Sequence, residues 1–147
     1  MSTISILFNI DCTDNKIWGK IERCCDNIMT SSLENIPYIK HNTKYKYYNA
    51  ICFGQTCNHV ILNELEHNFF SNIICFDPIL YGDDMKSFYN LQNIKCKLTI
   101  ISTNGTNRES LTNINHNIKV CNIKKKYLKT TYLKNLISLE TLEQYDF

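Results

Sequence analysis

Residues 47–62 read YYNAICFGQTCNHVIL, and this stretch decides the fold. Its first half, from Tyr48 to Gly54, is an apolar run typical of a strand that is covered on both faces. Gly54 permits a sharp turn there. Beyond the turn, four apolar residues recur at helical spacing: Val60, Ile61, Leu65 and Phe69. The stretch therefore predicts a buried strand, a tight turn and a helix in immediate succession.

Four further apolar runs have the same strand-like character: Ile4–Ile10, Asn72–Pro78, Cys96–Ser102 and Ile118–Ile123. Helical patterns fill the gaps and the end of the chain. They comprise Ile17, Ile21, Cys24, Cys25 and Ile28 after the first run, a short segment from Glu109 to Asn115, and a C-terminal helix marked by Leu128, Leu133, Leu136, Ile137 and Leu139. The polar segment from Tyr38 to Lys46 is predicted to be a long surface loop, and Asp83 to Lys86 the next. Alternating strands and helices imply βαβ crossovers. We expect a three-layer α/β fold, with a mostly parallel sheet of about five strands and helices on both faces.

Length and composition place the chain among ordinary globular domains. With 147 residues and 44% hydrophobic content, it is expected to form a single domain over residues 1–147 and to bury roughly 68–70% of its unfolded surface. Asn, Ile and Lys are abundant while Gly (4) and Pro (2) are scarce. That bias indicates an A+T-rich coding genome, as in many parasites and in insect or giant viruses.

Charge alone selects no partner, because the net charge is only +2. It is unevenly placed, however: residues 110–139 contain six lysines and no acid. One interpretation is a solvated helix and strand edge. The other is contact with RNA or phosphate, for which the residues at the centre of the patch are Lys124, Lys125, Lys126 and Tyr127.

The eight cysteines favour a reduced protein over a disulfide framework. No signal peptide is recognisable at the start, and no apolar run approaches the ~20 residues that span a bilayer. Cys52, Cys75 and Cys121 lie inside apolar runs, where a thiol behaves as a small hydrophobic group. There is no Cys-x-x-Cys spacing. We expect a cytoplasmic protein without a metal or cofactor, and nothing here predicts its oligomeric state.

Taken in order, these segments resemble the α/β-hydrolase fold over nearly the whole chain. Residues 54–58, GQTCN, stand where that family has the Gly-x-Ser-x-Gly nucleophile elbow. Asn72–Pro78 resembles the family strand that ends in an Asp-Pro or similar pair. The resemblance implies a hydrolase site with Thr56 in the nucleophile place, Asp11 in the oxyanion loop and Asn107 in the acid loop.

The residues at those places differ from a working site. Threonine replaces serine at Thr56, and Asn58 fills the last glycine place. Amides stand where the acid loop needs aspartate, and no histidine follows the last strand. A carboxylate at Asp11 would oppose the negative charge that develops on an oxyanion.

These differences favour a non-catalytic binding or protein-interaction domain derived from a hydrolase, with a protein or small-ligand partner. The first alternative is an atypical esterase or thioesterase that uses Thr56 or Cys57. The latter is either a buried thiol or a nucleophile at a helix N-terminus. The second alternative is RNA or phosphate binding through the lysine-rich C-terminal third.

Overall fold

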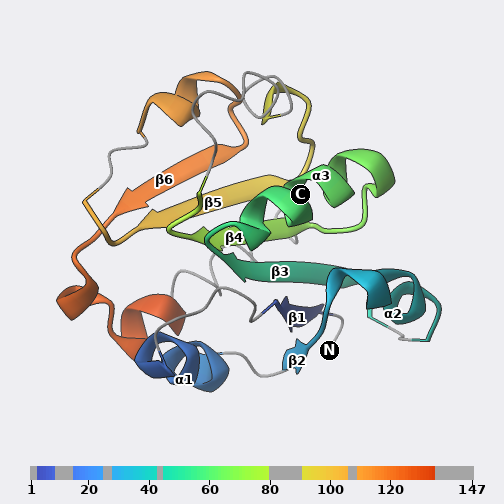
Figure 1. The fold of residues 1–147 in the computed structure, drawn as a ribbon, viewed down its shortest axis with the longest axis horizontal. Coiled ribbons are helices and arrows are strands. Elements are labelled where there is room, and N and C mark those ends of the chain that lie inside the picture. The colour runs from blue at the N-terminus through green and yellow to red at the C-terminus, as the bar shows by residue number, and fades with distance from the viewer. Residues whose placement is uncertain are drawn as a thin grey trace.

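The computed structural model describes residues 3–8, 15–24, 28–42, 45–79, 91–105 and 109–134. Within them, six strands form one sheet in the order β2-β1-β3-β4-β5-β6 (Figure 1). The strands are β1 (Thr3–Leu7), β2 (Ile28–Thr30), β3 (Tyr47–Phe53), β4 (Asn72–Phe76), β5 (Lys97–Ser102) and β6 (Ile118–Asn122). Every pairing is parallel. The three-layer α/β fold expected from the sequence is confirmed.

Strand β2 is the strand that the sequence pattern missed. Helix α1 (Asn15–Cys24) ends before Ile28, which the helical spacing had placed on the same helix. Instead, Ile28 pairs with Ser5 of β1 at the edge of the sheet. A strand of three residues is too short to display a period of two, so pairing with β1 decides its structure.

The predicted loop from Tyr38 to Lys46 is wrong in its first half. Helix α2 (Ile36–Asn42) follows a 3₁₀ turn, η1 (Leu33–Asn35), and continues to residue 42. Ile36 and Ile39 are buried, and their i,i+3 spacing turns both toward the core. Pro37 is tolerated because it falls in the first turn of the helix. The second predicted loop, Asp83 to Lys86, lies outside the described residues.

Side chains alternate between two cores along the central strands. Ala50, Cys52, Ile73 and Cys75 belong to the core beneath α2 and α3 (Thr56–His67). Ile51 and its neighbours on the other face belong to the core beneath α1. Figure 1 shows α3 in front of β3 and β4. Both faces of the sheet are therefore covered, which explains why its strands read as continuous apolar runs.

The chain after β6 returns to the α1 face. A 3₁₀ turn, η3 (Lys125–Tyr127), precedes Leu128, which is fully buried with Leu133 against Ile17 and Ile21. Lys20 Nζ donates a hydrogen bond to the Leu128 carbonyl at 2.9 Å. Residues 130–134 are helical, as predicted, and the rest of the expected terminal helix lies beyond the described part.

The short helix expected from Glu109 to Asn115 is a 3₁₀ turn, η2 (Glu109–Asn113). None of the helices in the described ranges is long and apolar enough to cross a membrane.

Candidate functional site

Sheet topology directs attention to the carboxyl ends of β1 and β3. After β1 the chain runs to β2 on one side, and then returns to β3 on the other side of β1. In open α/β sheets, ligands bind outside the carboxyl ends of the strands at such a switch point. The loop after β1, which contains Asp11, lies outside the described residues. The turn after β3 is fully described.

The strand, turn and helix predicted around Gly54 are confirmed. β3 ends at Phe53, Gly54 has a φ of +53°, Gln55 is in the right-handed α region, and α3 begins at Thr56. In a nucleophile elbow the nucleophile itself occupies the strained turn position. Here the left-handed residue is Gly54, two places before Thr56. The apex of the turn therefore carries no side chain.

The groups that follow the apex face the protein interior. Thr56 is 5% exposed and Cys57 is 0% exposed. The Cys57 amide donates to the Gly54 carbonyl at 3.3 Å, and the Asn58 amide donates to the Gln55 carbonyl at 3.1 Å. An oxyanion hole uses the amide that follows the nucleophile. With Thr56 as nucleophile that amide would be Cys57 N–H, which is already engaged within the turn.

Asn58 braces the turn against the segment that follows β4. Its Nδ2 donates to the Ile79 carbonyl at 2.5 Å, while the Ile79 amide donates to the Gly54 carbonyl at 3.0 Å. In the sequence, Asn58 was identified only as the residue that fills the last glycine place of the elbow motif. Its structural role depends on a partner 21 residues away and has no local pattern.

Asp77 ties the carboxyl ends of β4 and β5 together. Its φ is +44°, and its amide donates to the Ile101 carbonyl at 2.8 Å. Its carboxylate accepts hydrogen bonds from the Thr103 amide at 2.6 Å and from the Thr103 hydroxyl. The Asp-Pro pair that carried part of the resemblance thus supports the loop ends of the sheet.

The other residues singled out in the sequence are scattered. Asn107, like Asp11, lies outside the described ranges. Lys124, Lys125, Lys126 and Tyr127 are exposed after β6, three strands away from β3. The Lys126 ammonium lies 5.0 Å from the centre of the Tyr127 ring. The described histidine side chains, His59, His67 and His116, are exposed.

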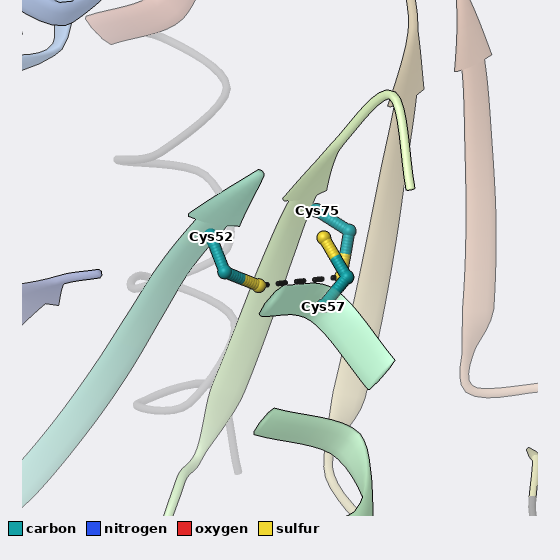
Figure 2. A group of neighbouring side chains, drawn as sticks. All are labelled: Cys52, Cys57 and Cys75. Carbon is teal, nitrogen blue, oxygen red and sulfur yellow. Dashed lines mark hydrogen bonds between the residues drawn. The ribbon is translucent and has the colours of Figure 1, made fainter. Parts of the chain in front are cut away.

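Three cysteines meet beneath the turn, and sequence reasoning did not bring them together. Figure 2 shows Cys52 of β3, Cys75 of β4 and Cys57 of α3 pointing toward one another. Their Sγ atoms all lie within 4.8 Å of one another, and Cys52 Sγ is 3.6 Å from Cys75 Sγ. Each residue is 0% exposed. We call this group the thiol cluster.

The pKa values of the three thiols are shifted in different directions. Burial raises the pKa of Cys52 and of Cys57 well above the ordinary thiol value. Hydrogen bonds from Cys52 and Cys57 lower the pKa of Cys75 to about 5. Negative charge in the cluster is therefore best held on Cys75, and Cys57 is disfavoured as a free thiolate nucleophile.

One sequence signal could have revealed the cluster. β3 and β4 both end in Cys-Phe, at Cys52-Phe53 and Cys75-Phe76. Neighbouring parallel strands that end at the same level pair such residues directly, and Cys52 is indeed the register partner of Cys75. Cys57 lies on the first turn of the following helix, above the same face.

The described residues form a three-layer α/β fold around a parallel six-stranded sheet, with a strand–turn–helix unit at Gly54. An esterase from Pyrococcus furiosus is similar to this chain, with a TM-score of 0.64 over 97% of this chain and 81% of the esterase chain. The sequence identity is 10%, so the likeness shows the fold alone. No protein-family model matches the sequence, and no curated protein matches it.

Proposed function

We propose that this chain is a non-catalytic binding or protein-interaction domain derived from a hydrolase-like fold. The observation that carries the proposal is the Gly54 turn. Its apex has the left-handed backbone of an elbow but no side chain, and Thr56 is 5% exposed. Gly54, at the position from which a hydrolase presents its nucleophile, has no side chain that could act as one.

The remaining catalytic roles support the same proposal. A hydroxyl is a weak nucleophile at neutral pH unless an adjacent base accepts its proton, and general-base help contributes ~10²–10⁴-fold in rate. The Cys57 amide is bonded to Gly54 instead of being open to an oxyanion. Removing an oxyanion-hole donor costs ~10²–10³-fold in rate. An enzyme lacking both kinds of help would have little rate above background.

The test is reaction with a fluorophosphonate probe and with p-nitrophenyl esters of short and medium chain length. We expect no labelling and no turnover above background for the full chain, and no change in Thr56→Ala or Cys57→Ala. Saturable hydrolysis by the unaltered protein that Thr56→Ala abolishes would overturn the proposal. Gly54→Ser sharpens the test, because it places a hydroxyl at the apex itself. Activity in that variant would reveal a base and an oxyanion hole that are otherwise competent.

The first alternative is an atypical esterase or thioesterase that uses Thr56 or Cys57, and the fold likeness to an esterase supports it. Catalysis by either residue requires the first turn of α3 to open, because both side chains are buried. Labelling by an activated acyl thioester, mapped to one of these two residues by mass spectrometry, would favour this alternative.

The second alternative is RNA or phosphate binding at Lys124, Lys125, Lys126 and Tyr127. The exposure of all four side chains supports it. Binding to single-stranded RNA would weaken steeply as salt rises, because each phosphate contact releases counterions. Replacing the three lysines by glutamine would then reduce both the affinity and its salt dependence. Unchanged RNA binding in that triple variant would exclude this surface.

The proposed setting is a reducing, cytoplasmic one. The six cysteines within the described residues are free thiols, which supports that setting: Cys24, Cys52, Cys57, Cys75, Cys96 and Cys121. Mass measurement after alkylation in denaturant, without reductant, tests it on the whole chain. We expect eight alkylated cysteines. A stable deficit of two hydrogens per bridge would place the protein in an oxidising compartment instead.

A further inference from the structure

We propose that the thiol cluster of Cys52, Cys57 and Cys75 is a binding site for one soft, closed-shell metal ion, and that copper(I) is the ion it fits. This inference is independent of whether the Gly54 turn is catalytic. It rests on how three rigid elements bring sulfur atoms to one point in the core.

The geometry is close to that of a metal-bound trio. Thiolates bound to an ion at about 2.3 Å lie about 4 Å from one another in a trigonal arrangement. In the thiol cluster the Sγ atoms are within 4.8 Å of one another, and the Cys52–Cys75 separation is 3.6 Å. Side-chain shifts of under about 1 Å would complete the site, a range that rotamer adjustment covers.

The donor set selects the class of ion. Within the described residues, the cluster offers three sulfur atoms and no carboxylate or imidazole. Thiolate ligands favour copper(I), zinc and iron–sulfur clusters. Structural zinc sites and iron–sulfur clusters take four protein ligands. Copper(I) is satisfied by two or three sulfur ligands, and it needs no water in a site where every cysteine is 0% exposed.

The charge of the copper-bound site follows from the number of protons released on binding. Binding breaks two S–H bonds, two protons leave to the buffer, and copper remains in the +1 state. Copper forms bonds to two thiolate sulfurs and is also coordinated by the third sulfur as a neutral thiol, so the site has three sulfur ligands and one net negative charge.

The competing explanation is that the three cysteines only fill space, as buried thiols commonly do. Cys96 provides a matched control. It is 8% exposed, belongs to the same core beneath α3 and lies outside the thiol cluster. If the cysteines only fill space, substitution at any of the four positions should have the same effect on copper binding. A metal site predicts that only three of them affect binding.

The experiment is an anaerobic titration of the reduced full chain with copper(I) in competition with a chromophoric copper(I) chelator. We expect one copper per chain by native mass spectrometry. Cys52→Ala, Cys57→Ala and Cys75→Ala should each weaken binding by at least ~100-fold, while Cys96→Ala should leave it unchanged. Copper should raise the melting temperature of the unaltered chain, because the ion binds the folded state. It should not raise that of a variant in which Cys52, Cys57 and Cys75 are all replaced by alanine.

A measurement on the unaltered protein keeps the proposal testable if the variants fold poorly. X-ray absorption should show copper(I) with sulfur ligands only. Nitrogen or oxygen ligands, more than one copper per chain, or no uptake at all would overturn the site. Equal loss of binding in Cys96→Ala would do the same. Zinc(II) that displaces copper(I) from the loaded protein would overturn the choice of ion.

Discussion

At both ends of α3, backbone amides are hydrogen-bonded within the protein, but the groups that accept these bonds differ. At its end, the Asn68 amide donates to the Glu64 carbonyl at 2.8 Å, with Asn68 in the left-handed conformation. Glu64 Oε1 accepts from the amides of Phe69 and Phe70 at 2.7 and 2.6 Å. These hydrogen bonds cap the end of the helix. At its start, where a hydrolase would keep donors open for substrate, the Cys57 amide is bonded within the turn.

The comparison shows that the Cys57 and Asn58 amides at the start of α3 are hydrogen-bonded within the turn. An open helix N-terminus binds anions because its first amides lack partners. Here the turn carbonyls of Gly54 and Gln55 accept from Cys57 and Asn58. The ends still differ in one respect: the start depends on a glycine backbone, whereas the end depends on a buried carboxyl group. The predictions below test that difference.

The largest effect is expected at the end of the helix. Glu64→Ala removes an acceptor shared by two amides, and Glu64 is 2% exposed. Unpaired buried donors cost ~1–3 kcal/mol each. Because the hydrogen bond from the Phe69 amide is only partly buried, we expect a loss of about 2–4 kcal/mol in the free energy of unfolding, measured with urea. Glu66→Ala is the control, because the Glu66 side chain is 77% exposed. Equal losses in the free energy of unfolding for the two substitutions would show that the hydrogen bonds of Glu64 do not stabilise the fold.

The next effect is expected at the start of the helix. Gly54→Ala places a side chain at a φ of +53°, which costs about 1–2 kcal/mol in the left-handed region. Gly19→Ala is its opposite control, because Gly19 lies inside α1 with only the Arg23 side chain within 4 Å. That substitution should stabilise the protein by ~0.5–1 kcal/mol. If Gly54→Ala were also stabilising, the turn would not have the backbone described.

A smaller effect is expected from the brace across the turn. Asn58→Ala removes the hydrogen bond to the Ile79 carbonyl, and a neutral hydrogen bond contributes ~1 kcal/mol. Water can reach Ile79, which is 52% exposed, so the loss should not exceed that value. His59→Ala, on the exposed side of the same helix, should change the stability little. Chemical unfolding of both variants decides whether Asn58 is a brace or only added bulk.

The last prediction concerns pH. Burial raises the pKa of Glu64 above its ordinary value of 4.5, despite the two amides that lower it. Between the ordinary pKa of 4.5 and the raised pKa of the folded state, Glu64 keeps a proton in the folded protein that it has lost in the unfolded chain. The free energy of unfolding therefore falls as pH rises through this window. Glu64→Gln keeps an acceptor oxygen and does not titrate. Its unfolding energy, measured from acidic to neutral pH, should lack that decline. An identical decline in both proteins would assign it to another group.

Much of the architecture was readable from local pattern. The five apolar runs became β1, β3, β4, β5 and β6, because strands buried on both faces need continuous apolar residues. Gly54 marked the turn because its backbone can adopt a positive φ. The predicted sheet lacked β2, and the predicted loop hid most of α2. Both elements are short and are stabilised mainly by what they pack against.

The site was less accessible to sequence reasoning. The pattern placed Thr56 and Cys57 at the start of a helix, and the structure agrees. A buried thiol was one of the two interpretations of Cys57, and Cys57 is 0% exposed. The pattern did not reveal that Thr56 would be buried or that Asn58 would reach Ile79, since neither follows from neighbours in the chain. Asp11 and Asn107 stay predictions, because they lie outside the described residues.

The sequence by itself determined the alternation of strands and helices, the parallel sheet and the glycine turn, since each follows from residue type and period. The tertiary structure decided where the turn has its apex. The Gly54 amide continues the ladder to the Phe76 carbonyl at 3.1 Å, so the chain leaves the sheet at that residue and Thr56 follows it into the helix. The same register brought Cys52 beside Cys75. Residues 23 positions apart meet only when two strands pair, and no local pattern contains that information.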